Sequence, residues 1–304
     1  ASGRLSSTAL VCRYLNRIAR YDRHGIRLNA VPILNPDVFA DARTADERRQ
    51  QGKSLGPLDG IPYLAKASYA VRGLPLTSGS PAFEHLIARE DAFVIAQLRA
   101  AGAILIGLTN MPPMAAGGMQ RGLFGRAESP YNAAFLTAAF ASGSSNGSGS
   151  GLAAGFAAFA LAEETWSSGR APATNNGLVA YTPSRGMISM RGNWPLIPTM
   201  DVVVPYARSV ADLLEVLNVL VTDDPHTRGD FWRAQQAVPM TPASAQRPID
   251  YTALIDSHAL RGKRLGVPRM YINKDADSAR PIATRPSVID CWHNAAAALV
   301  AAGA

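Results

Sequence analysis

Two hydrophobic patterns alternate along the first half of the chain. Residues 7–21 carry the apolar positions of one helical face at Leu10, Val11, Tyr14, Leu15 and Ile18. We expect further helices at 36–50 and 91–101, whereas the short apolar runs at 61–67 and 103–107 are typical of buried strands. Strands and helices that alternate in this way favour an α/β fold with a parallel or mixed sheet.

The pattern changes after residue 139. Residues 141–151 are almost all glycine, serine or alanine, and we expect them to form a loop that packs inside the protein. An alanine-rich buried helix is predicted to follow through Leu161, with a second turn of small residues at 167–169. Residues 223–257 are polar and contain four prolines, which predicts a surface excursion, and residues 289–304 are expected to form a helix.

Composition and charge exclude several classes of protein. Apolar residues make up 47% of the chain and charged residues 17%, which disfavours long disordered segments. The net charge of +7 comes from scattered basic residues, so we expect no nucleic-acid binding. No apolar run reaches the roughly 18 residues of a membrane span. Two cysteines, Cys12 and Cys291, form neither a disulfide framework nor a metal site, which favours a reducing, cytoplasmic location.

Lys66 is the most unusual residue of the predicted strands, because it lies in an otherwise apolar run. A buried lysine loses hydration of its charged form, so its pKa falls and it can act as a neutral base. A lysine at a strand end that reaches water is the alternative. Residues 143–147 match the Gly-x-Ser-x-Gly nucleophile elbow, but no histidine lies in a convincing partner segment. Metal, dinucleotide and P-loop motifs are absent from the sequence.

Several segments together resemble the amidase signature family over about residues 5–220. Lys66 follows the segment 56–62, and the two small-residue turns lie at 143–147 and 165–172. The segments between and after these, in the family's order, are 101–112, 181–186, 199–201 and 207–212. The resemblance implies an α/β fold in which a mixed central sheet is sandwiched between helices.

The resemblance also implies a Ser-cisSer-Lys triad without metal or cofactor. Ser168 matches the nucleophile, Ser144 the bridging serine that follows a cis peptide, and Lys66 the base. The implied oxyanion hole and substrate-binding residues are Thr165, Trp166, Ser167, Met114, Ala115 and Met119. The small residues and two methionines near 114–120 suggest an apolar cavity for aryl or aliphatic amides. Arg121 could bind a carboxylate of the substrate; the alternative is a surface arginine that is exposed to solvent.

Several departures from the family's pattern bear on catalysis. Ala67 stands where an acidic residue usually follows the lysine, so one polar partner is missing. Ser142 and Asn146 replace glycines of the first serine loop. Trp166 and Ser167 occupy the oxyanion turn, where glycine is expected, so Ser167 must adopt the backbone geometry of glycine or the turn must differ.

The domain prediction is a single amidase-type domain over residues 1–304, with a catalytic core at about 50–220. Residues 261–268 resemble the strand that opens the family's last section, and the strands that should follow Ala304 are missing. An open apolar sheet edge favours aggregation. We therefore expect a second chain or a continuation that completes the sheet; a natural short form covered by its last helix and a homodimer are alternatives.

The sequence therefore predicts an amide hydrolase, with esters as further substrates, that acts on a small molecule through an acyl-enzyme on Ser168. Ser144 and neutral Lys66 would relay the proton. Two alternatives stay open. One is an inactive homologue that binds an acyl or amide ligand. The other is the A-type subunit of an amidotransferase, which would work with protein partners and transfer RNA.

Overall fold

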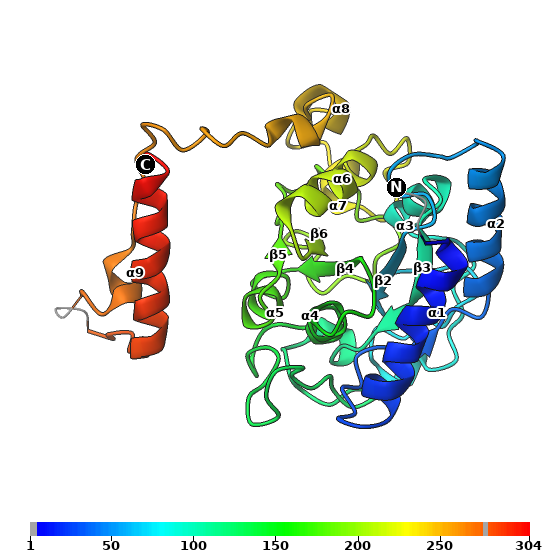
Figure 1. The fold of residues 1–304 in the computed structure, drawn as a ribbon, viewed down its shortest axis with the longest axis horizontal. Helices are drawn as coiled ribbons and strands as arrows, with labels where there is room; N and C mark the ends of the chain where they lie inside the picture. Colours follow the sequence, from blue (N-terminus) through cyan, green and yellow to red (C-terminus); the bar gives the residue numbers. More distant parts are fainter. Residues whose placement is uncertain (1–4, 276–278) are drawn as a thin grey trace. The chain divides into compact units, whose positions relative to one another are not determined.

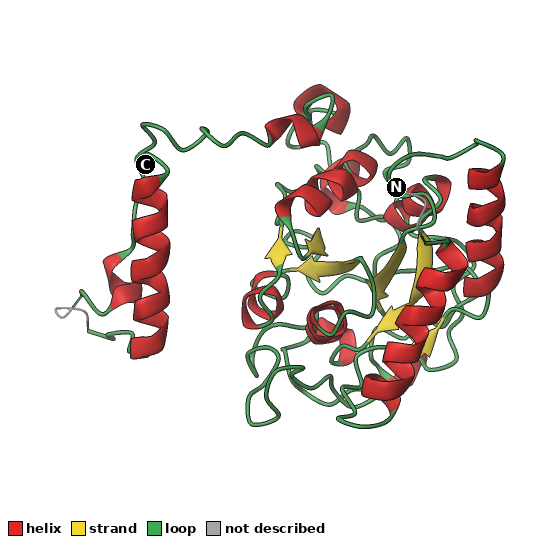
Figure 2. Cartoon of the chain, viewed as in Figure 1, coloured by secondary structure: helices red, strands yellow, loops and turns green. Residues whose placement is uncertain are grey.

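A six-stranded mixed sheet organises the larger part of the chain (Figures 1 and 2). The computed structural model describes residues 5–275 and 279–304 and divides into two compact units, residues 1–252 and 253–304. The strands are β1 Ile33–Leu34, β2 Pro62–Lys66, β3 Ile104–Thr109, β4 Phe159–Glu164, β5 Val179–Ala180 and β6 Val202–Ala207. The mixed α/β architecture predicted from the sequence is confirmed.

The helices of the first unit surround this sheet. They are α1 Ser7–Arg17, α2 Val38–Gln50, α3 Phe93–Ala100, α4 Asn146–Ala153, α5 Arg170–Asn175, α6 Val210–Leu220, α7 Phe231–Ala234 and α8 Ala243–Gln246. A π-helical segment, Ile18–Arg23, extends α1, and 3-10 turns lie at Pro81–Phe83, Pro113–Ala115 and Tyr251–Leu254. The helices expected at 7–21, 36–50 and 91–101 and the strands at 61–67 and 103–107 are confirmed.

The strand order places the ends of three strands at one edge of the sheet. The order is β1-β3-β2-β4-β6-β5, with β2 parallel to both β3 and β4, while β1, β6 and β5 run antiparallel to their neighbours. Parallel strands end at the same edge, which is where α/β sheets place their ligand sites. Lys66, the last residue of β2, therefore lies beside β4, which continues past it to Glu163 and Glu164.

Helices cover both faces of the sheet, as Figure 2 shows in red around the yellow strands. On one face, α3 and α6 pack on apolar side chains such as Tyr63, Phe159 and Val203. On the other face, α1, α2, α4 and α5 pack on Leu64, Ala160 and their neighbours. Alternate residues of each strand serve the two cores, as the two-residue repeat of a strand requires.

The prediction for residues 141–161 is wrong in its assignment of elements. Most of the predicted loop forms helix α4, and most of the predicted alanine-rich helix forms a turn and strand β4. Tertiary packing overrides helix propensity here. A side-chain carbon on Gly147 would lie 2.4 Å from the backbone nitrogen of Asn110, so only a glycine helix can approach the chain this closely. The expectation that these small residues pack inside the protein is confirmed.

The polar segment 223–257 contains two one-turn helices, α7 and α8, and many exposed residues. Buried residues anchor it at intervals. Asp224 pairs with Arg191 at 2.8 Å, and Arg247 donates to the carbonyl of Val221 at 2.6 Å. These ionic and polar contacts hold the part of the segment that lies in the first unit, and the surface excursion over 223–257 stays a prediction.

The second unit consists of a 3-10 turn, Arg269–Ile272, and helix α9, Pro286–Ala301, joined by irregular backbone. The helix expected at 289–304 is confirmed. The strand expected within 261–268 is wrong, because residues 263–268 are irregular and exposed, and the described residues of this unit form no strand. The single domain over 1–304 stays a prediction.

Two simpler expectations concern membranes and cysteines. None of the described helices is long and apolar enough to cross a membrane. The thiols of Cys12 and Cys291 are free and exposed.

Gly147→Ala is expected to destabilise the first unit by about 1–3 kcal/mol, the usual cost of overpacking a core. At an open site within a helix, replacing glycine by alanine instead increases the stability by about 1 kcal/mol. The free energy of unfolding from urea titration measures the difference. Gly266→Ala is the control, because no heavy atom lies within 4 Å of the added carbon. A Gly147→Ala protein as stable as wild type would show that the close approach does not constrain this helix.

Candidate active site

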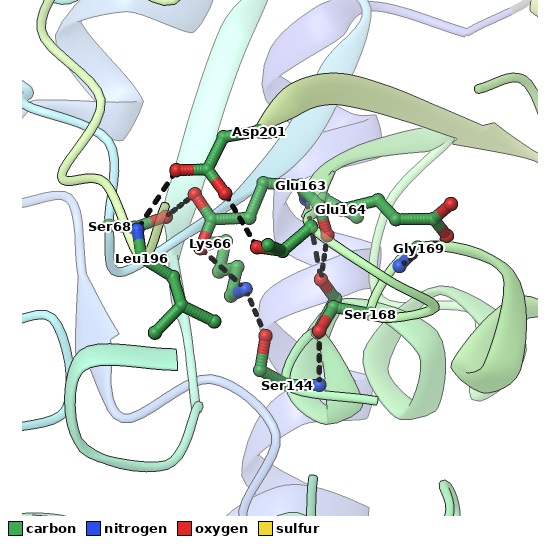
Figure 3. Close-up of polar contacts among 12 residues, drawn as sticks. Lys66, Ser68, Ser144, Glu163, Glu164, Ser168, Gly169, Leu196 and Asp201 are labelled. Carbon is green, nitrogen blue, oxygen red and sulfur yellow. Dashed lines mark hydrogen bonds and ion pairs between the residues drawn. The ribbon is translucent and has the colours of Figure 1, made fainter. Parts of the chain in front are cut away.

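Lys66 lies at the end of β2 with its side chain completely buried. Its Nζ donates to Ser144 Oγ at 2.6 Å and to Glu163 Oε1 at 2.7 Å (Figure 3). Burial lowers the pKa of Lys66 from its ordinary value, and the facing carboxylate of Glu163 opposes this shift. Of the two sequence alternatives, the structure therefore shows a buried lysine and not one that reaches water.

Ser144 and Ser168 come from different segments and meet next to the lysine. Ser144 is fully buried just before α4, and Ser168, which is 5% exposed, lies in the turn between β4 and α5. The backbone N–H of Ser144 donates to Ser168 Oγ at 3.2 Å. Within the described residues the two hydroxyl groups do not bond directly to each other. The structure thus brings the three predicted triad residues together, with Ser144 in the middle.

The turn that carries Ser168 is held from both sides. Thr165 Oγ1 donates to Asp201 Oδ1 at 2.5 Å, and Asp201 Oδ2 accepts from the N–H groups of Leu196 and Ile197. Burial raises the pKa of Asp201, while the Thr165 hydroxyl acts in the opposite direction. This contact fixes the start of the turn to the segment that leads into β6.

Glu164 fixes the other end of the same turn. Its Oε2 accepts from the N–H groups of Gly169 and Arg170, and its Oε1 accepts from the Arg170 guanidinium at 2.7 Å. Within the described part of the chain, the backbone N–H groups of Trp166, Ser167 and Ser168 have no acceptor. Three unpaired donors in a fixed turn can stabilise a negative oxygen.

The turn does not need the backbone geometry of glycine. We expected either that Ser167 adopts the backbone geometry of glycine or that the turn differs from the family's turn. Neither Trp166 nor Ser167 has a positive φ, so the turn differs. Ser142 Oγ and Ser167 Oγ contact each other, so two residues that replace glycines form a pair across the site. Asn146 is buried, and its Nδ2 donates to the carbonyl of Gly118 at 2.7 Å.

The expected cis peptide before Ser144 is not found. All peptide bonds of the described residues are trans. Lys66 Nζ nevertheless reaches Ser144 Oγ, so the contact between base and bridging serine is made with a trans bond.

The residues predicted to shape the pocket lie near the lysine strand but line none of the described cavities. The Met114 N–H donates to the carbonyl of Ser78, whose own N–H donates to the carbonyl of Ala67. Ala115 and Met119 are buried. A cavity of about 420 Å³ instead opens beside the oxyanion turn, with Thr165, Trp166 and Arg185 in its wall. The described residues contain no cluster of three or more metal-ligating side chains.

Sequence reasoning missed Glu163 as a partner of the lysine. Its Oε2 also accepts from Ser68 Oγ at 3.0 Å, and its side chain is 4% exposed. Two glutamates at the end of an apolar run were the available signal, since a charge in a buried strand needs a partner of opposite charge. The acidic contact that Ala67 cannot provide thus comes from the neighbouring strand β4.

Comparison with known proteins places these features in a family. The profile of the family described as Amidase matches residues 9–285. The A-type subunit of glutamyl-tRNA(Gln) amidotransferase from Chloroflexus aurantiacus is 34% identical over 273 residues, which cover 89% of this chain and 52% of the relative. The same subunit from Anaeromyxobacter sp. (strain K) is 33% identical and covers 99% and 57%. The chain spans about half the length of the curated relatives it matches.

Solved structures give the same result. Peptide amidase from Stenotrophomonas maltophilia superimposes with a TM-score of 0.82 at 33% identity, over 99% of this chain and 58% of that protein. An amidase family protein from Bacillus anthracis reaches a TM-score of 0.84 at 28% identity, over 99% and 56%. The matching profile, the shared sheet and the sequence identity together show that this chain belongs to the amidase (amidase signature) family.

Proposed function

We propose that the protein hydrolyses amides, and esters of similar shape, through an acyl-enzyme on Ser168. One observation carries this proposal: a buried lysine contacts Ser144 Oγ at 2.6 Å, and the N–H of the same Ser144 contacts Ser168 Oγ. A serine becomes a nucleophile only when a base takes its proton. Lys66 is the one described amine within reach of this hydroxyl pair.

The proton would move in two transfers. Ser144 Oγ passes its own proton to the neutral amine of Lys66 and takes the proton of Ser168 Oγ, which attacks the carbonyl carbon. The second transfer requires the hydroxyl groups to approach each other when substrate binds, a tightening that is common between free and bound active sites. The protonated relay then returns a proton to the leaving amine.

The unpaired N–H groups of the turn can stabilise the negative charge that develops on the substrate during attack. As Ser168 attacks, the carbonyl oxygen becomes negative, and the N–H groups of Trp166 to Ser168 can donate to it. Each such donor typically lowers the activation free energy by about 3–4 kcal/mol. Water, activated by the same lysine and serine, would then release the acid from Ser168.

The cavity beside the turn supports a substrate that is partly apolar. Trp166 and Met200 lie in its wall together with the exposed Arg185. A small-molecule amide fits a space of about 420 Å³. The arginines of the cavity wall are Arg170 and Arg185, and Arg121 is not among its lining residues.

A second candidate is supported by the names of the curated relatives. Because these relatives belong to an amidotransferase, this chain could act as the A-type subunit of such an enzyme, releasing ammonia from glutamine for a partner protein. Copurification from native cells distinguishes the two functions: partner subunits in equal amounts support the amidotransferase, and a protein without them supports the amidase. The non-catalytic alternative differs from both, because its serine would not react with a fluorophosphonate.

Ser168→Ala is expected to abolish labelling by a fluorophosphonate probe and turnover of an amide and ester panel followed by mass spectrometry, because the attacking oxygen is removed. The hydroxyl accepts one buried hydrogen bond, from the Ser144 N–H, so the melting temperature should fall by no more than a few degrees. Ser54→Ala, an exposed serine, serves as the control and should keep wild-type labelling. Turnover at the wild-type rate in Ser168→Ala would refute the assignment, and an unlabelled wild type would support the ligand-binding homologue.

Lys66→Met is expected to lower turnover by about 10²–10⁴-fold, the usual contribution of a general base. The change also leaves the buried Glu163 side chain without its lysine partner, which typically costs about 3–5 kcal/mol of stability. Rates are therefore compared per folded protein, with the folded fraction taken from circular dichroism. Lys53→Met, at an exposed lysine, is the control. If Lys66→Met turns over within a few-fold of wild type, the lysine is structural.

A further inference from the structure

Glu163 is a buried carboxylate that the relay described above does not use. Its Oε1 accepts from Lys66 Nζ at 2.7 Å and its Oε2 accepts from Ser68 Oγ at 3.0 Å, so both oxygens are fixed (Figure 3). The backbone is fixed as well, because the N–H of Glu163 donates to Ser145 Oγ and its carbonyl accepts from the same hydroxyl. Ser145 is the neighbour of the bridging Ser144.

The amine therefore lies between a carboxylate and a serine hydroxyl. A neutral amine has two N–H bonds and one lone pair. When one N–H points to Glu163 Oε1, the nitrogen is held where its lone pair can face Ser144 Oγ, the atom whose proton it must take. A lysine on a four-carbon stem has many rotamers, and a fixed acceptor removes this freedom.

We propose that Glu163 is the positioning residue of the lysine base: it orients the Lys66 amine toward Ser144 and stabilises the ammonium that forms when the serine proton arrives. The proposal rests on the proposed function. The group it names does not touch the substrate and acts through Lys66 alone, as the buried carboxylate of a serine-histidine-aspartate triad acts through its imidazole.

The proton balance is simple. Before attack, Lys66 is a neutral amine and Glu163 a carboxylate. The O–H bond of Ser144 breaks, an N–H bond forms on Lys66, and Ser144 takes the Ser168 proton as Ser168 bonds to the carbonyl carbon. The pair Lys66–Glu163 then carries one positive and one negative charge, and it returns to its first state when the proton passes to the leaving group.

The neighbouring charges do not replace Glu163. Asp201 is the other carboxylate near the pair, but its oxygens accept from Thr165, Leu196 and Ile197. Tyr69 lies against the pair with its hydroxyl donating to the carbonyl of Ala162, and burial raises its pKa well above the ordinary value, so it stays neutral. Glu164 pairs with Arg170.

The sign of the pH effect follows from these contacts. Burial lowers the pKa of Lys66, and the Glu163 carboxylate raises it again. Activity needs the neutral amine, so the rate increases as pH rises through this pKa. Removing the carboxylate lowers the pKa further and moves this increase to lower pH. The charge of the carboxylate alone accounts for this displacement, so the positioning role is read from the plateau rate, which a merely structural carboxylate would leave unchanged.

The test is the rate of fluorophosphonate labelling of Ser168 against pH in wild type, Glu163→Gln and Glu163→Asp. Glutamine keeps the shape of the glutamate side chain, and its amide nitrogen can donate to Ser68 Oγ where the carboxylate accepted from it. We expect the labelling rate of Glu163→Gln at high pH, where it no longer changes, to be about a hundredfold below that of wild type. The rise of the rate with pH should occur about one pH unit or more below that of wild type. Glu163→Asp keeps the charge but not the reach, so its increase should stay near that of wild type while its plateau rate falls at least about tenfold.

The control is Asp224→Asn, which removes a buried carboxylate from the remote Arg191 pair and should leave the pH of the increase unchanged. If the labelling rate of Glu163→Gln increases over the same pH range as that of wild type, or at higher pH, while wild type is labelled normally, the role of Glu163 is overturned and the proposed function stays intact. If Glu163→Gln does not fold, Glu163→Asp decides: a wild-type rate overturns the proposal. A wild type that is not labelled at any pH overturns both.

Discussion

The burial of one lysine is the constraint on which this structure depends. A charged amine removed from water costs several kcal/mol unless it is paired or loses its proton. Lys66 is completely buried, so the fold must supply a partner within hydrogen-bonding distance, and Glu163 does so from the adjacent strand. The same burial makes the amine a usable base. Structural requirement and chemical capability therefore have one physical cause.

The sheet topology explains how the partners meet. Strands β2 and β4 are parallel neighbours, with Ala65 paired to Leu161, so both end at one edge of the sheet. The chain that leaves β4 makes the turn with Ser168, and the segment before α4 brings Ser144 to the same edge. Helix α4 can lie this close because the residue that faces Asn110 is Gly147, in a helix made mostly of glycine and serine. The unusual composition of residues 141–151 thus serves the approach of Ser144 to Lys66.

The sequence allowed prediction of the features that depend on local pattern. The helices at 7–21, 36–50 and 91–101 follow from apolar spacing, and the two short strands follow from their apolar runs. Residues 141–161 could not be assigned correctly, because a glycine- and serine-rich segment has a low helix propensity and its helix depends on tertiary packing, as at the close approach of Gly147 to Asn110. The region of the site was predictable from ordered motifs, but Glu163 was not, since its partner is nearly a hundred residues away and only the strand register joins them.

The central claim is that Ser168 is the serine activated by this arrangement. Mass-spectrometric mapping of the peptide that carries the adduct, after reaction of the wild-type protein with a fluorophosphonate, tests it directly. Ser144, Ser145, Ser167 and Ser168 are all close to the lysine, and fragmentation distinguishes them. The account predicts a single adduct on Ser168. An adduct on Ser144, or on a serine away from this site, would contradict it.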